Sequence, residues 1–297
     1  MEGEGKVSPP GVLAAKAPRG GLHVKAGLLS RGKDYIVAKL NTNFPGNGAR
    51  FGLPTIQGLI VVYNGENGSP LAVFDSIEIT IKRTAAASAV AAKYLARKNS
   101  SIVTLIGCGQ QAPAQLRALH SVLPLKTTYV FDANEVAAQK LAVEMAAELQ
   151  IQPVGDLKTA LQNSDICVTC TTAREFFIRR EDIAPGTFIA AVGADDEHKQ
   201  EIDPALMASA KIVADNLEQC CAIGDTHHAI AAGLMGKEDV YAGLSEIVSG
   251  RRPGRVNDDE IIIFDSTGVA TEDAAAATLI LEKALSDGKN SYFDFAA

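Results

Sequence analysis

The stretch Ser101-Ile-Val-Thr-Leu-Ile-Gly-Cys-Gly-Gln-Gln-Ala112 carries the strongest fold signal in the sequence. A short apolar run, which predicts a buried strand, leads into a G-x-G-x-x-A motif made by Gly107, Gly109 and Ala112, and a helical pattern follows to about Ser121. A glycine motif between a strand and a helix is typical of a βα unit that binds a dinucleotide. Gly107 permits the tight turn, Gly109 lets a pyrophosphate approach the backbone, and Ala112 allows close packing of the helix on the strand.

An acidic residue follows at the spacing that such a unit needs. Asp132 ends the next predicted strand, 20 residues beyond Ala112. An acid at this place accepts hydrogen bonds from the adenine ribose and repels a 2′-phosphate. The alternative, an ordinary βα turn that needs a glycine, is less favoured because strand, turn, helix and acid occur together. We therefore expect a dinucleotide, NAD(H) in preference to NADP(H), to be bound by Gly107, Gly109, Gln110, Gln111, Ala112 and Asp132.

Two kinds of pattern surround this unit. Short apolar runs that alternate with helical stretches predict βαβ units and a parallel sheet; they are Thr127–Phe131, Ile166–Cys170, Phe188–Val192, Lys211–Ala214 and Glu260–Phe264. Nearer the N-terminus, apolar runs separated by turn formers predict antiparallel strands over 35–40, 56–63 and 71–74, then a long helix over 75–97. Residues 1–33 begin without a clear helix, and residues 41–54 read as a loop. A closing helix is predicted over 273–285.

These patterns predict an α/β protein with two domains, in line with about 150 residues per domain. We expect a Rossmann-like parallel-sheet domain over residues 91–269. We expect an α+β domain to be formed by residues 1–90 together with the C-terminal segment 270–297.

Composition narrows the class of protein. The 297 residues are 47% hydrophobic and 21% charged, as in ordinary globular proteins, and the net charge of −7 argues against a nucleic-acid binder. The sequence shows neither a signal-peptide pattern nor an apolar stretch of the roughly 18 residues that a membrane span needs. Five cysteines in a chain of this length favour a reducing compartment over a disulfide framework. We therefore expect a cytoplasmic protein without a membrane partner.

Two cysteine and histidine groupings resemble metal or redox motifs only superficially. Cys167 and Cys170 have C-x-x-C spacing, but residues three apart on a strand point to opposite faces. Cys220-Cys221 and His227-His228 are adjacent pairs, and neighbouring residues rarely bind the same ion. We expect no metal site.

Arg83 and Lys39 are basic residues in apolar surroundings. Arg83 would need an anionic partner if buried, and its planar fork suits a carboxylate; a structural ion pair with Asp75 or Glu78 is the alternative. Lys39 should share a strand face with Val37 and point inward. Desolvation would then lower its pKa into the range useful for proton exchange, whereas a solvated strand edge is the alternative.

Polar residues also follow several predicted parallel strands, whose carboxyl ends line ligand crevices. Asp195 follows the strand at 188–192, where it could alternatively cap a helix. Thr171 and Thr172 follow the strand at 166–170, and Ser266-Thr267-Gly268 follows the late strand, where a simple turn is the alternative.

The sequence as a whole resembles the ornithine cyclodeaminase/μ-crystallin family, which includes archaeal alanine dehydrogenase and reductases of cyclic imino acids. The resemblance extends from about Lys6 onward and is carried by Lys39–Asn47, Gly52–Gly58, Arg83–Ser88, Ala91–Arg97, Ile106–Gln111, Val192–Asp195 and Phe264–Gly268. It implies a Rossmann domain that binds a nicotinamide cofactor, and an α+β domain that binds substrate and forms a homodimer.

The resemblance also implies roles for individual residues. Arg83 would bind the substrate carboxylate, Lys39 would hydrogen-bond the imine or carbonyl or donate the proton, and Asp195 would act near the substrate nitrogen. The stretch Ser266–Gly268 would lie beside the nicotinamide. From their place after a strand, Thr171 and Thr172 are expected to approach the cofactor too.

The resemblance implies an oxidoreductase of small α-imino or α-amino acids, of the Δ1-pyrroline- or Δ1-piperideine-2-carboxylate reductase type or the alanine dehydrogenase type. Two alternatives are an ornithine cyclodeaminase, a lyase that uses bound NAD, and a μ-crystallin-like protein that binds NADPH and a small ligand. Retention of Lys39, Arg83 and Asp195 argues against the last of these.

The sequence departs from the family near its beginning. An N-terminal helical segment of relatives has no counterpart here, and Gly11 replaces a basic residue that follows Pro9-Pro10. Lys16, Arg19 and Lys25 are candidates to replace its contact with a carboxylate. His23, where relatives often carry an arginine, is a further candidate for substrate binding.

Overall fold

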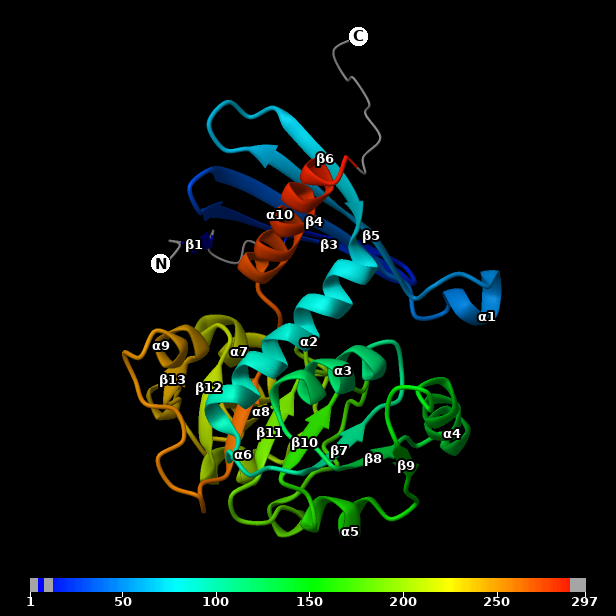
Figure 1. Ribbon diagram of the computed structural model, residues 1–297, viewed down its shortest axis with the longest axis vertical. Coiled ribbons are helices and arrows are strands. Elements are labelled where there is room, and N and C mark those ends of the chain that lie inside the picture. The colour runs from blue at the N-terminus through cyan, green and yellow to red at the C-terminus, as the bar shows by residue number, and fades with distance from the viewer. Residues whose placement is uncertain (1–4, 8–12, 289–297) are drawn as a thin grey trace. The chain divides into compact units, whose positions relative to one another are not determined.

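Two β-sheets, one antiparallel and one parallel, organise the computed structural model, which describes residues 5–7 and 13–288 (Figure 1). The chain divides into two units. We call the unit made by residues up to Arg83 and from Val269 onward the terminal unit, and the unit Thr84–Gly268 the central unit. The long helix α2 (Ser76–Leu95) contains the division at 83/84 and therefore contributes to both units. The boundary predicted at residue 90 lies within the same helix.

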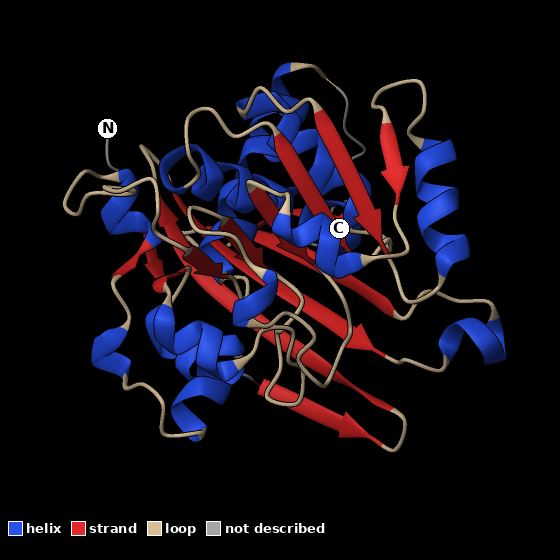
Figure 2. Ribbon diagram, turned by 90° about the horizontal axis from the view of Figure 1, so that it is seen from below, coloured by secondary structure: helices blue, strands red, loops and turns tan. Residues whose placement is uncertain are grey.

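The central unit is built on an eight-stranded parallel sheet with the order β13-β12-β14-β11-β10-β7-β8-β9. Figure 2 draws the strands of the structure in red and the helices in blue. Its strands are β7 (Ile102–Ile106), β8 (Thr127–Phe131), β9 (Ile151–Pro153), β10 (Ile166–Thr169), β11 (Phe188–Ala191), β12 (Lys211–Ala214), β13 (Ala242–Gly243) and β14 (Ile262–Asp265). Its further helices are α3 (Ala112–Val122), α4 (Glu135–Glu144), α5 (Leu157–Gln162), α6 (Pro204–Ser209), α7 (Leu217–Ile223), α8 (Asp225–Ala231) and α9 (Leu244–Val248), with short 3-10 helices at Arg180–Asp182 and Lys237–Asp239.

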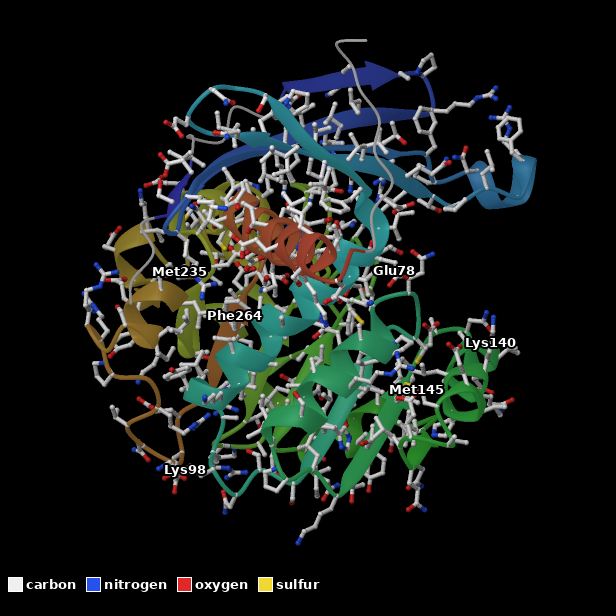
Figure 3. The ribbon with its side chains drawn as sticks, turned by 45° about the horizontal axis from the view of Figure 1, so that its top comes forward. Glu78, Lys98, Lys140, Met145, Met235 and Phe264 are labelled. Atoms are coloured by element: carbon white, nitrogen blue, oxygen red, sulfur yellow. The ribbon has the colours of Figure 1, made fainter. Side chains whose placement is uncertain are left out.

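Both faces of this parallel sheet are buried. On β11, Phe188 belongs to one hydrophobic cluster and Ile189 to the other, because successive side chains point to opposite faces. Helices α3 and α4 and the second half of α2 contribute to the cluster that contains Phe188, whereas α5, α6 and α8 contribute to the cluster that contains Ile189. Phe264 of β14, labelled in Figure 3, is fully buried in the first cluster. Burial on both faces explains why these strands read as continuous apolar runs.

The terminal unit is built on a six-stranded antiparallel sheet with the order β1-β3-β4-β5-β6, in which β2 also pairs with β3. Its strands are β1 (Gly5–Val7), β2 (Leu13–Ala17), β3 (Gly20–Ser30), β4 (Asp34–Asn43), β5 (Ile56–Asn64) and β6 (Pro70–Asp75). The short helix α1 (Asn47–Phe51) follows β4, and the helix α10 (Ala270–Ser286) packs on the sheet.

The two faces of the antiparallel sheet differ in burial. Alternation along β4 places Tyr35, Val37 and Lys39 on the face that packs against Ala274 and Ala277 of α10, and all five residues are buried. The opposite face remains apolar and open: Ile36, Leu59 and Val73 are 42%, 52% and 50% exposed, respectively.

The parallel and antiparallel sheets agree with the fold predicted from the sequence, but two segments differ. Residues 1–33 were expected only to lack a clear helix, yet they include β1, β2 and the eleven-residue β3. The glycines and lysines of this segment interrupt the alternation of apolar and polar residues that indicates a strand. Pairing with β4 over Gly21–Ser30 stabilises β3. The predicted loop 41–54 contains α1, which ends in the left-handed residue Gly52.

Candidate active site

Lys39 is buried in the terminal unit beside a carboxylate. Its side chain is on β4, the residue is 5% exposed, and its Nζ lies 2.6 Å from Oδ2 of Asp273 on α10. Burial and the positive charges of Arg83 and Lys25 lower the pKa of Lys39 to about 8, although Asp273 opposes them. The inward orientation expected from the sequence is confirmed. An ammonium with this pKa can exchange protons near neutral pH.

Arg83 meets the same helix. Its Nε donates to Oδ1 of Asp273 at 3.0 Å, and its Nη1 donates to Oε2 of Glu272 at 2.8 Å. Both acids lie in the first turn of α10, where negative charge is favoured by the helix dipole. The alternative partners considered from the sequence are engaged elsewhere: Asp75 accepts the N–H of Ile77, and Glu78, labelled in Figure 3, pairs with Lys82.

We call Lys39, Arg83, Glu272 and Asp273 the charged cluster. Both cations were predicted from the sequence, whereas both carboxylates were not. The available signal was Thr271-Glu-Asp273, an acidic pair in the first turn of an alanine-rich helix that begins two residues after Ser-Thr-Gly. In this arrangement a guanidinium and an ammonium that can release its proton share the carboxylate of Asp273.

The substitutes proposed for the missing basic residue have different positions. Lys25 on β3 is opposite Lys39 in the strand register, so the two side chains share a face. Lys16 and Arg19 are exposed, and His23 is exposed on β3 opposite Asn41. Lys25 is thus the candidate that the fold brings to the charged cluster. Gly11 lies outside the described residues.

In the central unit, the glycine-rich turn has the backbone that a dinucleotide requires. Gly107 has φ of 94°, and a Cβ there would lie 2.7 Å from the carbonyl oxygen of Cys170, so the fold itself demands glycine. A Cβ on Gly109 would meet no atom within 4 Å, so packing does not require this glycine. Its bare backbone is free to approach a ligand at the start of α3, where Ala112 is buried and Gln110 and Gln111 form the turn.

The side chain of Asp132 lies beside this turn. Its Oδ2 accepts the N–H of Cys108 at 2.8 Å, and its Oδ1 accepts the N–H of Asn134 at 2.8 Å. The carboxylate is therefore fixed beside the glycine motif from the end of β8, as expected of an acid that binds a ribose. The residues present fit a dinucleotide.

Glu201, which the sequence analysis missed, ties together the ends of two neighbouring strands. Its Oε1 accepts the N–H and the hydroxyl of Thr171, each at 2.7 Å, while its Oε2 accepts the hydroxyl of Thr169 at 2.6 Å and the N–H of Gly193 at 2.8 Å. Glu201 is fully buried, and burial raises its pKa although these hydrogen bonds oppose the rise. The hydroxyl of Thr171 is thus engaged with Glu201, and Thr172 follows it in the loop after β10.

Asp215, also missed, fixes the segment Ser266–Gly268 after β14. Its Oδ2 accepts the N–H of Gly268 at 2.6 Å and the hydroxyl of Ser266 at 3.3 Å, and its Oδ1 accepts the hydroxyl of Thr267 at 3.1 Å. The Gln219 amide adds a hydrogen bond to Thr267 Oγ1 at 2.9 Å. No local pattern predicts these contacts, because Asp215 and Gly268 are 53 residues apart in the chain.

Asp195 lies in the loop after β11 and its side chain is 52% exposed. It pairs with Lys199 at 2.5 Å. Burial of Lys199 opposes its protonation, but the attraction to Asp195 is part of what raises its pKa. A turn and not a helix follows Asp195, so the alternative role of helix cap does not apply.

The cysteine pair behaves as strand geometry predicts. Cys167 packs in one hydrophobic cluster of the central unit and Cys170 packs against the other, so the two lie on opposite faces of the sheet. In the part of the chain that the structure describes, no group of three or more His, Cys, Asp or Glu side chains is placed to hold a metal ion. Within the same residues, no helix has the length and apolar character needed to cross a membrane.

Comparison with known proteins places the chain in a family. The model of the ornithine cyclodeaminase/mu-crystallin family matches residues 4–288. The chain belongs to this family. It is 40% identical to alanine dehydrogenase from Archaeoglobus fulgidus over 264 residues, which are 88% of this chain and 80% of the relative.

Solved structures of the family superpose over nearly the full length. Δ1-Pyrroline-2-carboxylate reductase from Thermococcus litoralis, in complex with NADH and L-proline, is 34% identical with a TM-score of 0.93, covering 98% of this chain and 90% of that one. An archaeal alanine dehydrogenase dimer with bound NAD is 38% identical with a TM-score of 0.92, covering 98% of this chain and 89% of that one.

Proposed function

We propose that the protein is an NAD(H)-dependent oxidoreductase that interconverts a small α-imino acid and the corresponding α-amino acid. The observation that carries the proposal is the buried pairing of Lys39 and Arg83 through Asp273, in a chain that also has the dinucleotide turn. Relatives named as an alanine dehydrogenase and as a pyrroline-2-carboxylate reductase support this reaction class. The substrate is accordingly a cyclic imino acid or the imine formed from a 2-keto acid and ammonia.

The cofactor would be held by residues of the central unit. The turn from Gly107 to Ala112 would bind the pyrophosphate and Asp132 the adenine ribose, which favours NAD(H) over NADP(H). Thr171, Thr172 and the segment Ser266–Gly268 are proposed to contact the nicotinamide side. When bound, the cofactor supplies or accepts the hydride at the substrate Cα.

The protein's own side chains bind and protonate the substrate. Arg83 binds the substrate carboxylate with its planar fork, which fixes the position of the adjacent Cα. In the reductive direction the C=N bond becomes a C–N single bond, and Lys39 gives its proton to the nitrogen. Asp195 is proposed to hydrogen-bond the substrate nitrogen.

A substrate panel tests this reaction class. Purified protein is assayed with Δ1-pyrroline-2-carboxylate, Δ1-piperideine-2-carboxylate and pyruvate, each with NADH or NADPH and with or without ammonia. We expect oxidation of external NADH with at least one imino acid, or with pyruvate only when ammonia is present. Conversion of ornithine to proline without external NADH would instead identify a cyclodeaminase, and tight ligand binding without turnover would identify a binding protein.

The cofactor preference has its own test. In the double variant Asp132→Ser/Ala133→Arg, the charge that repels a 2′-phosphate is replaced by one that attracts it, so preference should shift towards NADP(H). The ratio of kcat/KM for the two cofactors measures the shift. An unchanged ratio would show that Asp132 does not select the cofactor.

We also propose that the protein is a cytoplasmic homodimer. The open apolar face of the antiparallel sheet, with Ile36, Leu59 and Val73 exposed, is the kind of surface that subunit interfaces bury. The archaeal alanine dehydrogenase relative is described as a dimer. Sedimentation should give about twice 31.2 kDa. Leu59→Glu should weaken the dimer, whereas Val248→Glu, at an exposed apolar residue of the central unit, should not; a monomeric parent protein would refute the proposal.

A further inference from the structure

Asp273 occupies a special place in the charged cluster because each of its oxygens faces a different cation. Oδ2 lies 2.6 Å from Nζ of Lys39, and Oδ1 accepts from Nε of Arg83 at 3.0 Å. The Asp273 side chain is 1% exposed, so solvent does not compete for either contact. The three residues come from α10, β4 and α2, and a single carboxylate joins them.

We propose that Asp273 is a positioning residue for the reaction: it holds the proton donor Lys39 and the carboxylate anchor Arg83 at a fixed separation. The inference rests on the proposed function, which assigns those roles to Lys39 and Arg83. Substrate carboxylate and substrate nitrogen are both bonded to Cα, so the groups that bind them must keep a matching spacing.

Asp273 has a second effect: its negative charge favours the protonated form of Lys39. Lys25 on β3 and Arg83 on α2 face Lys39 with positive charge, the neighbouring β5 residue Ile60 is apolar, and Asp273 supplies negative charge from α10. Burial and both cations already lower the pKa of Lys39 to about 8. Without the charge of Asp273, the pKa would fall further and a larger fraction of Lys39 would be unprotonated at neutral pH.

Glu272 contrasts with its neighbour. It contacts Nη1 of Arg83 at 2.8 Å, and its side chain is 20% exposed. Asp273 occupies the Nε edge of the guanidinium, so an incoming substrate carboxylate meets the Nη edge, where Glu272 lies. Glu272 is therefore the partner that substrate displaces, and Asp273 is the one that stays.

The test is the titration of Lys39 in Asp273→Asn, measured without substrate or cofactor. Competitive acetylation over a range of pH, quantified by mass spectrometry of the Lys39 peptide, reports the pKa because only the neutral amine reacts. The pKa should lie near 8 in the parent protein and about one pH unit or more lower in the variant. Glu282→Gln is the matched control: it removes another α10 carboxylate, one that accepts a hydrogen bond from Tyr35 of β4, and should leave the titration unchanged.

Kinetics then test the consequence. For imine reduction, the rate should fall as pH rises through the pKa of Lys39, and Asp273→Asn should move this decline to lower pH. If the pKa of Lys39 is one unit lower in Asp273→Asn, the smaller protonated fraction alone predicts about a five-fold loss of kcat at pH 8. If Asp273→Asn titrates like the parent, or its pH profile is unshifted, the proposal is wrong.

Two further outcomes distinguish a failure of the role proposed for Asp273 from a failure of the proposed function. If Asp273→Asn does not fold, Asp273→Glu, which keeps the charge and changes the spacing, should titrate like the parent but lose kcat/KM; parental kcat/KM would overturn the positioning role. If the parent reduces no imino acid while the Lys39 titration still depends on Asp273, the proposed function fails and the charge effect stands.

Discussion

Two groups of buried or partly buried carboxylates in this protein are stabilised in different ways. In the terminal unit, Asp273 and Glu272 face the cations Lys39 and Arg83. In the central unit, the fully buried Glu201, Asp225 and Asp265 accept hydrogen bonds from hydroxyl and backbone N–H groups. We call these three the carboxyl cluster. The first group forms ion pairs with cations, whereas the second group connects chain segments through hydrogen bonds.

Burial raises the pKa values of the carboxyl cluster. Burial, partly offset by hydrogen bonds from Thr226, raises the pKa of Asp265 to about 7, and burial together with the charge of Asp265 raises the pKa of Asp225 well above its ordinary range. Asp225 Oδ2 and Asp265 Oδ1 are buried without a hydrogen-bond partner among the described residues. A carboxyl group in such surroundings retains its proton close to neutral pH.

Loss of Lys39 should have the largest effect. Lys39→Ala removes the proposed proton donor of the charged cluster and should lower kcat by about 10²–10⁴-fold, the usual contribution of general acid–base catalysis. NADH binding, measured by fluorescence titration, should be preserved because the proposed cofactor residues lie in the central unit. Parental kcat in this variant would show that the charged cluster does not carry the chemistry.

Arg83→Lys should come next. The change keeps the charge but removes the planar fork, so the substrate carboxylate loses its paired hydrogen bonds. Truncating a buried charge-assisted pair costs about 2–5 kcal/mol, which corresponds to about 30-fold or more in kcat/KM. The exposed neighbour Lys82, changed to Ala, is the control and should retain activity. Loss of NADH binding in Arg83→Lys would contradict the assignment of Arg83 to the substrate.

Glu201→Ala changes the carboxyl cluster of the central unit and should lower the stability of the protein. It removes the acceptor for Thr171 and Gly193, and buried donors left unsatisfied cost about 1–3 kcal/mol each. Chemical denaturation should therefore show a loss of about 2–6 kcal/mol in the free energy of unfolding. Asp203→Ala, which removes a carboxylate on an exposed helix cap, is the control, with a smaller loss of about 1 kcal/mol. A Glu201→Ala protein of parental stability would mean that the carboxyl cluster does not tie the strands.

The contrast between the two groups also explains what could be predicted from the sequence. The dinucleotide turn and Asp132 were identifiable because strand, turn and acid are local and regularly spaced, and the inward orientation of Lys39 followed from strand alternation. The partners of these side chains could not be predicted from the sequence. Arg83 and Asp273 are 190 residues apart, and Glu201 and Thr171 are 30 residues apart. No local pattern reveals which acid will meet which cation, because tertiary packing decides it.

The stability of the protein should change only gradually with pH, and Asp265 and Lys39 should contribute with opposite sign. Asp265 has a pKa raised from 3.8 to about 7, so the native state binds a proton that the unfolded state has lost between these values. Its contribution is fully present below pH 3.8 and is lost as pH rises towards 7. Lys39 has a pKa lowered from 10.5 to about 8, so the unfolded state binds the extra proton between pH 8 and 10.5, and stability rises with pH in that window.

Each contribution has a limiting slope of about 1.4 kcal/mol per pH unit. Denaturation curves at a series of pH values would isolate them by difference from the parent. Asp265→Asn should remove the decline that Asp265 contributes below pH 7, and Lys39→Met should remove the rise that Lys39 contributes above pH 8. A decline between about pH 4 and 7 that Asp265→Asn leaves unchanged, or a rise above pH 8 that Lys39→Met leaves unchanged, would mean that these groups do not titrate as their contacts indicate.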